Sequence, residues 1–373
     1  MPESALLEDR VRAGPDAADA LSTVDPSASA ARVWQRLGAT GVLREQYRRR
    51  TPTGLVADPD RLGATLRAVD AREDNGTTLS VLVQSASALP ILAAGTGPEF
   101  DEVVSGDREV ALAATDAAAA GSDLTGLGTE IEIDGDTVRL EGAKRWVTTA
   151  TRAAYFLVLA RHRPGRHFTA FTWVLVPADA AGVRVSPATS TLLAGAGIGH
   201  VEFAGVRLPA SAVLGRTGRG LALFARHMGT ERLAGAQWAT ALTSRVLAKT
   251  RTALVEREID GRALWDHDSV RQEFAGCLVR VRSLRALYEA LGERVVEDHD
   301  TTSAATLKAA VGLTADDVLS CCARWQGADG FADGGLQLVR AEAAVFGIGG
   351  GVTELMLGAV ADNAETVLEE LRA

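Results

Sequence analysis

Residues 130–140 read Glu-Ile-Glu-Ile-Asp-Gly-Asp-Thr-Val-Arg-Leu, and this stretch sets the middle of the chain apart from both of its ends. Apolar and polar residues alternate on either side of Asp134-Gly135, which is the period of a half-buried β-strand. Asp-Gly is favoured in the two-residue turns that join antiparallel strands. The stretch therefore predicts a β-hairpin.

Further strand-like runs follow this hairpin at residues 155–159, 171–176 and 200–206, which are rich in β-branched and aromatic side chains. No helix of useful length separates them, so an alternating βαβ arrangement with a parallel sheet is not expected. This order predicts an antiparallel, barrel-like β-domain at residues 108–216.

On both sides of this region apolar residues recur at steps of three and four, as on one face of a helix. The segments with this pattern are 28–106, 224–246, 270–288 and 304–323, and a last helix is expected at Val352 to Leu371. We therefore predict an α+β fold, with an N-terminal helical domain at residues 1–107 and a C-terminal helical bundle at residues 217–373.

The composition excludes several classes of function. A chain of 373 residues with 47% hydrophobic and 23% charged residues is globular, and its net charge of −9 offers no basic face for nucleic acid. The three cysteines form no disulfide framework, and no histidine joins cysteines or carboxylates at metal-ligand spacing. We expect no metal and no nucleic-acid partner.

Export and membrane insertion are not expected either. Residues 1–24 are acidic and lack the apolar core of a signal peptide. The most apolar stretch, residues 79–94, is interrupted by Gln84 and Pro90 and is too short for a membrane span. A buried helix is predicted there, in a cytoplasmic protein.

A basic cluster, Arg44, Arg48, Arg49 and Arg50, lies between the N-terminal helical segments. Such a cluster is usual on a solvated loop or helix face. It also suits a contact with an anionic cofactor or a carrier protein. Both interpretations stay open at this point.

Glu231 interrupts an apolar helical stripe. Phe224, Met228, Glu231, Gly235 and Trp238 follow one another at steps of four, three, four and three, so Glu231 shares the face of its apolar neighbours. Desolvation raises the pKa of a carboxyl group and improves it as a base near neutral pH. The pattern therefore predicts a desolvated carboxylate, which would be a better base near neutral pH.

Four segments, in this order and spacing, resemble the acyl-CoA dehydrogenase family over nearly the whole chain. They are residues 111–116 with Gly121-Ser122-Asp123, residues 140–149, Glu231-Arg232 with Glu256-Arg257, and residues 327–331 followed by the glycine-rich turn at 349–351. The resemblance implies the acyl-CoA dehydrogenase fold, an FAD cofactor and the α,β-dehydrogenation of an acyl thioester.

The resemblance also implies roles for individual residues. The implied cofactor contacts are Thr115 and Thr148 on the isoalloxazine, Trp146 beside its ring, Arg257 on the pyrophosphate across a subunit interface, and Arg324 where the family has a glutamine. Ser122 is implied near the acyl or pantetheine arm. The contact of Arg257 across subunits implies a homodimer or a homotetramer.

The residue that removes the α-proton departs from the common pattern. Most of the family carries a glutamate before the glycine of a Glu-Gly-Thr turn, and Gly350 stands at that position here. Isovaleryl- and long-chain acyl-CoA dehydrogenases instead carry the base just before the helix arginine, which matches Glu231-Arg232. Glu231 is thus the predicted base, with Arg232 and Gly350 beside the substrate.

The substrate and partners are less defined. The N-terminal sequence resembles that of family members that act on acyl carrier proteins in bacterial secondary metabolism. We therefore expect an acyl-CoA or an acyl-carrier-protein thioester as substrate. The resemblance implies an electron-transfer flavoprotein as electron acceptor. Two alternatives remain: a flavin monooxygenase or oxidase of the same fold, and a non-catalytic scaffold that binds a thioester or a partner subunit.

Overall fold

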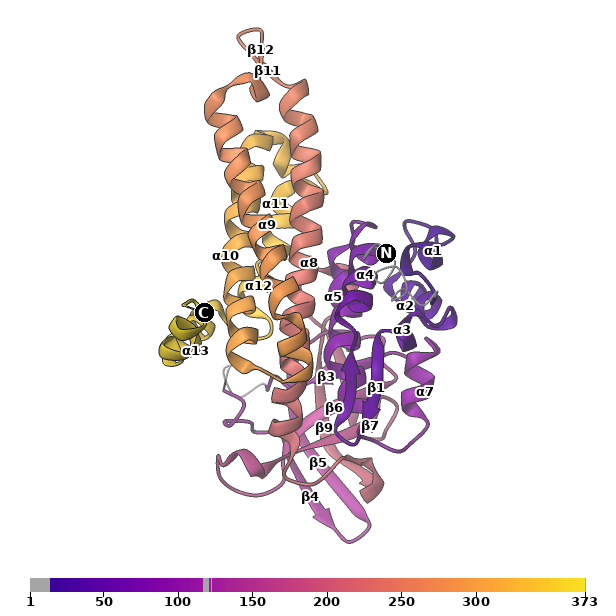
Figure 1. Cartoon of the computed structure of the whole chain (residues 1–373). Coiled ribbons are helices and arrows are strands. Elements are labelled where there is room, and N and C mark those ends of the chain that lie inside the picture. Colours follow the sequence, from indigo (N-terminus) through magenta and orange to yellow (C-terminus); the bar gives the residue numbers. More distant parts are fainter. Residues whose placement is uncertain (1–13, 117–120, 122, 373) are drawn as a thin grey trace, which may run out of the picture.

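The computed structural model describes residues 14–116, 121 and 123–372 of the chain. Two groups of helices flank one β-sheet in the sequence, and the C-terminal helices form a long column that rises from the sheet (Figure 1). The N-terminal helices lie beside this column. The order of helices, strands and helices confirms the predicted α+β architecture, and the domain boundaries at residues 107 and 216 stay predictions.

The N-terminal part combines short helices with one unexpected hairpin. Its elements are α1 (Ala17–Ser22), α2 (Ala30–Ala39), α3 (Val42–Glu45), β1 (Tyr47–Thr51), β2 (Gly54–Ala57), α4 (Pro59–Asp70), α5 (Asn75–Val83), α6 (Leu89–Leu92) and α7 (Glu99–Val104). Side chains of Asp58 and Asp74 accept hydrogen bonds from the first N–H groups of α4 and α5, which fixes where these helices begin.

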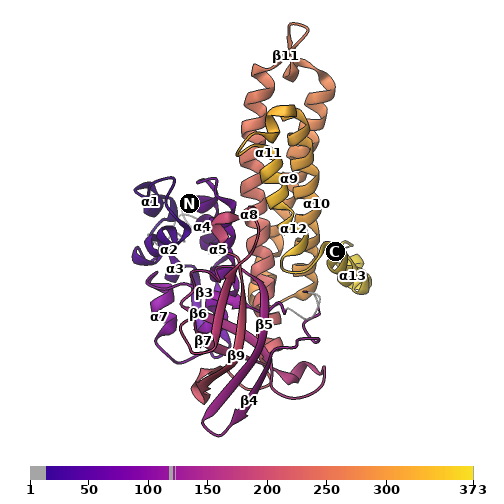
Figure 2. The ribbon, with the colours of Figure 1, turned by 180° about the vertical axis from the view of Figure 1, so that it is seen from behind.

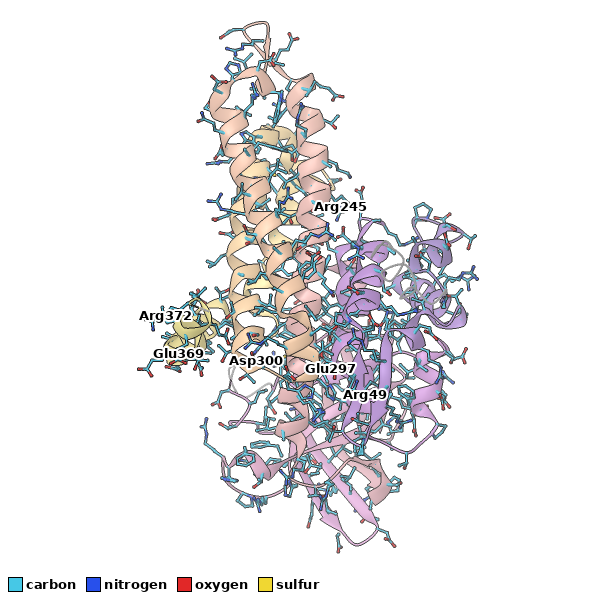
Figure 3. The ribbon with its side chains drawn as sticks, viewed as in Figure 1. Arg49, Arg245, Glu297, Asp300, Glu369 and Arg372 are labelled. Carbon is cyan, nitrogen blue, oxygen red and sulfur yellow. The ribbon has the colours of Figure 1, made fainter. Side chains whose placement is uncertain are left out.

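The basic cluster lies largely on β1, so the expected loop or helix face is wrong. β1 pairs with the buried strand β2, and its outer residues point to helix α9 (Asp268–Glu297). There Arg48 Nη2 lies 2.7 Å from Glu293 Oε1, and Arg49 pairs with Glu297 (Figure 3). These ion pairs hold the N-terminal part against the C-terminal bundle.

The predicted buried helix at residues 79–94 is confirmed, with one irregularity. Helix α5 continues through a π-helix, η3 (Gln84–Ala88), into α6, and residues 84–92 are all buried. A π-turn widens the backbone by one residue and is frequent at functional sites. In this segment the Ser87 side chain contacts the helix α8 (Gly220–Glu256).

The middle sheet has eight strands. They are β3 (Val110–Ala113), β4 (Glu130–Asp134), β5 (Thr137–Val147), β6 (Tyr155–Arg161), β7 (Phe171–Pro177), β8 (Val183–Pro187), β9 (Gly199–Pro209) and β10 (Val213–Leu214). The β4–β5 hairpin forms with Ile133 opposite Val138 and with Gly135 at φ 55°, as the sequence predicts. Buried apolar side chains of these strands form a core, in which Phe156 packs edge-on against Phe203.

Not every strand pair is antiparallel. β3 runs parallel to β6 over four residue pairs, and β4 meets β6 in parallel at Glu130 and Arg161. The hairpin β4–β5 lies between β3 and β6 in the sequence, so the chain has room to return and enter β6 in the same direction as β3. The antiparallel prediction is therefore correct for most pairs and wrong for these two.

The C-terminal bundle is built around three long helices. They are α8, α9 and α10 (Thr301–Gln326), and they are followed by α11 (Leu336–Ala343), α12 (Val345–Ile348), α13 (Thr353–Asp362) and α14 (Ala364–Glu370). Helices α11 and α12 lie along the bundle (Figure 2). The expected single last helix is wrong, because Asn363, with φ −111°, leaves the helical conformation between α13 and α14.

One stretch of this region is apolar enough to cross a membrane. Residues Leu336–Asp362 reach a mean hydropathy of 1.6, and 17% of the apolar window is buried. The structure divides this stretch among α11, α12 and α13, with the glycine-rich turn at residues 349–351 between the last two. It is therefore a series of short helices rather than one continuous span.

Candidate active site

Glu231 lies on α8 at the level of the π-helix η3. Its Oε2 accepts a hydrogen bond from Ser87 Oγ. The protein packed around the carboxyl raises its pKa above the usual value, and this desolvation outweighs the hydrogen bond from Ser87 and the charges of Arg232 and Lys308, which lower it. The predicted desolvated carboxyl is therefore found, and its second oxygen, Oε1, carries no hydrogen bond from the described residues.

Gly350 lies next to Glu231 in the C-terminal bundle. A β-carbon on Gly350 would lie 3.5 Å from Glu231 Oε1, 3.7 Å from Lys308 Cε and 4.0 Å from Arg232 Cγ. Arg232 Nε donates a 3.0 Å hydrogen bond to the Gly350 carbonyl. The two positions that the sequence compares as alternative sites for a catalytic glutamate are thus neighbours in space.

A small cavity of about 50 Å³ lies among these groups. Glu231, Arg232, Lys308, Gly349 and Gly350 line it on one side. Its apolar walls come from Leu79, Leu82, Val83, Trp238, Val311, Val345 and Phe346. A mostly apolar cavity with a few converging polar groups is the usual form of a small-molecule site.

Sequence reasoning missed Lys308 in this cavity. The residue is 4% exposed, and its ammonium donates a hydrogen bond to the Phe346 carbonyl. Burial and the charge of Arg232, against the opposing effect of Glu231, together lower its pKa to about 8. The helical period could have predicted its burial, because Lys308 lies on the same face of α10 as the buried Ala304 and Val311.

Thr115, Trp146 and Thr148 come together where β3 and β5 end. Arg145 N donates to Thr115 O at 3.1 Å, which joins the two strand ends. Trp146 is 58% exposed and has a φ of 55°, a conformation that side chains rarely adopt. Its ring meets His200 edge-on at 5.3 Å. A strained, exposed indole beside two partly buried threonines offers an aromatic wall and hydroxyl donors to a flat ring.

A buried ion pair fixes this loop. Lys144 Nζ lies 3.3 Å from Asp116 Oδ2 and donates to Ala114 O at 3.1 Å. Both side chains are almost fully buried. Lys144 precedes Trp146 by two residues and Asp116 follows Thr115, so the pair holds the expected ring contacts at one place.

The continuous helix of α5 and η3 connects the two groups of residues. At one end Ser80 Oγ bonds to Thr149 Oγ1 at 2.9 Å, next to Thr148. At the other end Ser87 holds Glu231. Seven residues of helix span about 10 Å, so the carboxyl of Glu231 lies within about two helical turns of the Trp146–Thr148 edge.

Arg257 and Arg324 lie elsewhere, at the far tip of the bundle. Arg257 donates to the carbonyls of Trp325 and Gln326 at 2.9 and 2.8 Å, and Arg324 pairs with Glu273. About 25 residues of helix, or about 40 Å, separate Arg257 from Glu231 along α8. The structure therefore does not bring these arginines to Thr115, Trp146 and Thr148 within one chain.

Ser122 lies outside the described residues. Across the part of the chain that the structure describes, no group of three or more histidine, cysteine, aspartate or glutamate residues is placed to hold a metal ion.

Two models of one protein family match the chain. "Acyl-CoA dehydrogenase, middle domain" matches residues 111–206, and "Acyl-CoA dehydrogenase, C-terminal domain" matches residues 218–365. The first segment holds Thr115, Trp146 and Thr148, and the second holds Glu231, Lys308 and Gly350.

Individual relatives agree with these models. The acyl-[acyl-carrier-protein] dehydrogenase MbtN of Mycobacterium sp. (strain MCS) is 26% identical over 70% of this chain and 67% of its own length. The cyclohexane-1-carbonyl-CoA dehydrogenase of Syntrophus aciditrophicus (strain SB) is 23% identical over 65% of this chain and 66% of its own. The matched region thus spans about two thirds of these relatives. The FAD complex of PigA shares the fold, with a TM-score of 0.82 at 18% identity over 93% of this chain and 92% of that chain.

Proposed function

Because the chain belongs to the acyl-CoA dehydrogenase family and has its fold, we propose that it is an FAD-dependent enzyme that dehydrogenates an acyl thioester at its α and β carbons. One observation supports the proposal most strongly. Glu231 Oε1 lies 3.5 Å from the point that a β-carbon on Gly350 would occupy. Glu231 would supply the carboxylate that this chemistry needs, from helix α8 instead of from the turn that holds Gly350.

Glu231 acts as the base that removes the α-proton. Ser87 holds Oε2, so Oε1 faces the cavity and is the oxygen that takes the proton. The raised pKa strengthens the carboxylate as a base, while Arg232 and Lys308 favour its ionised form. The apolar walls exclude water from the proton transfer.

The residues at the ends of β3 and β5 fit a bound flavin. When bound, FAD would supply the acceptor for the hydride that leaves the β-carbon. Thr115 and Thr148 would hold the ring by their hydroxyl groups, and Trp146 would pack beside it. The positive φ and the 58% exposure of Trp146 support this role, because they leave much of the indole open to a ligand.

The distant arginines support an oligomer. Arg257 is about 40 Å from Glu231 along α8, and Arg324 lies near it at the end of α10, so the tip of one chain would contact the FAD of another. We propose a homodimer or homotetramer in which Arg257 of one subunit reaches the pyrophosphate held by its neighbour. The thioester is carried by coenzyme A or by a carrier protein, and an electron-transfer flavoprotein reoxidises the enzyme.

Anaerobic bleaching of the purified protein's flavin absorbance tests the proposal. Acyl-CoA and acyl-carrier-protein thioesters should bleach the wild type, and a Glu231→Gln variant with the same flavin content should bleach about 100- to 10,000-fold more slowly. A yellow protein that no thioester bleaches would instead support oxygen chemistry, and a protein that binds thioesters without flavin would support a scaffold.

A further inference from the structure

Lysine is rare in this chain. Only Lys144, Lys249 and Lys308 occur among 373 residues, and the other cationic side chains are arginines. Lys144 is explained by its ion pair with Asp116, and Lys249 by its surface pair with Glu73. Lys308 is 4% exposed, lines the proposed acyl cavity and forms no ion pair with any described residue.

The ammonium of Lys308 has unused hydrogen-bonding capacity. It carries three N–H donors, and one described acceptor, the Phe346 carbonyl, takes one of them. Buried donors without acceptors are costly, and a buried charge without a partner is more so. The remaining donors of Lys308 are therefore available to a group that enters the cavity.

The charges around the cavity do not balance. Glu231 contributes one negative charge, while Arg232 and Lys308 each contribute a positive one, so the site carries a net charge of about +1 when all three are ionised. Apolar side chains supply the remaining walls. A ligand with a negative group would neutralise the excess charge, and a hydrocarbon chain would leave it uncompensated.

Lys308 lies within reach of the acyl chain of a bound substrate. A β-carbon on Gly350 would lie within 3.7 Å of both Lys308 Cε and Glu231 Oε1, so the two side chains face one space. A substrate with its α-carbon at Glu231 Oε1 extends its acyl chain into the same cavity. A group a few bonds beyond the α-carbon can reach Lys308.

We propose that the cavity selects a short acyl thioester that bears a carboxylate on its acyl chain, and that Lys308 binds this carboxylate. The inference rests on the proposed function, since it takes the cavity as the acyl site. A hydroxyl substituent would accept hydrogen bonds from the free N–H donors of Lys308, but it would not neutralise the excess positive charge. A carboxylate satisfies both, through charge-assisted hydrogen bonds. The small size of the cavity, about 50 Å³, favours a short chain.

The test compares substrates that differ only in this group. Butyryl is paired with succinyl, and pentanoyl with glutaryl, each as the coenzyme A and the pantetheine thioester. Anaerobic flavin reduction by the holoenzyme gives rate and half-saturation, and calorimetric titration of the Glu231→Gln holoenzyme gives a dissociation constant that does not depend on turnover. The wild type should prefer the carboxylated member of each pair by about tenfold or more.

Variants then assign the preference to Lys308. Lys308→Met should abolish or reverse it, and Lys308→Arg, which keeps the charge, should retain much of it. Lys249→Met, at an exposed lysine of α8, is the matched control and should leave the preference unchanged. The same substitutions in the Glu231→Gln protein are compared by their dissociation constants, measured by calorimetric titration.

Two results would overturn the inference: a wild type that prefers the uncharged member of each pair, or a Lys308→Met variant that weakens both members equally. Failure of the proposed function is a separate outcome. In that case no thioester reduces the flavin, while the calorimetric comparison of succinyl with butyryl still decides the role of Lys308.

Discussion

Glu231 Oε1 lies 3.5 Å from the point that a β-carbon on Gly350 would occupy, although the two residues belong to α8 and to the turn between α12 and α13. A carboxylate placed at either position therefore reaches the same small volume. This relationship explains how the chain can lack the common turn glutamate and still offer a base to the same substrate carbon.

Moving the carboxylate between these positions should restore activity. In a Glu231→Gln background, Gly350→Glu should recover part of the lost rate of anaerobic flavin reduction. Recovery will be partial because Gly350 has a φ of 73°, where a side chain costs about 1–2 kcal/mol. Gly350→Gln in the same background is the control, and recovery by glutamine would contradict a base role.

Ser87 should set the pH dependence of the reaction. Its hydrogen bond lowers the pKa of Glu231, so Ser87→Ala should raise that pKa further. Because the base must be ionised, the acidic limb of the rate profile should move to higher pH. Ser85→Ala is the matched control on η3, since Ser85 Oγ has no hydrogen-bond partner among the described residues. Equal profiles for the wild type and Ser87→Ala would refute the role of this bond.

Lys308 should make stability depend on pH. Its pKa falls from 10.5 to about 8 on folding, so between pH 8 and 10.5 the unfolded chain binds more protons, and stability should rise with pH. Below pH 8 the cost of burying the charge is about 3 kcal/mol. Arg232 and Glu231 are the charged groups that act on it. Lys308→Met should therefore raise the Tm at pH 7 and remove this rise, as thermal unfolding at several pH values would show.

Arg257 should affect flavin retention from a distance. Arg257→Met should lower the ratio of flavin to protein, although the residue lies about 40 Å from Glu231 along its own chain. Arg251→Met, one helix turn and a half earlier, is a control because its guanidinium packs on Trp265. Sedimentation of both variants separates loss of flavin from loss of assembly, and an Arg257→Met protein with full flavin content would count against a shared site.

The sequence predicted best where the signal was local. Residues 130–140 carry their own alternation and turn, so the hairpin follows from them alone. Strand β1 was missed because three consecutive arginines hide its alternation, and their partners Glu293 and Glu297 are about 245 positions away. The parallel pairing of β3 with β6 is likewise set by contacts that no local pattern records.

The candidate site shows the same division. Glu231 was identified from its local helical stripe and from the resemblance of Glu231-Arg232 to a family motif, and the structure adds the contact with Ser87 and the closeness of Gly350. Lys308 lies on an equally regular stripe, yet a lysine among alanines is usually taken as a solvated position. Only the packing of α8, α12 and α10 around it shows that its charge is buried.

The most direct test of the account is exchange of the α-protons of an acetyl thioester in deuterium oxide, followed by NMR. Acetyl has no β-carbon, so exchange reports the base alone, without hydride transfer. We predict that the wild-type holoenzyme catalyses this exchange and that Glu231→Gln, at equal flavin content, does not. Undiminished exchange by the Glu231→Gln enzyme would show that another group removes the proton.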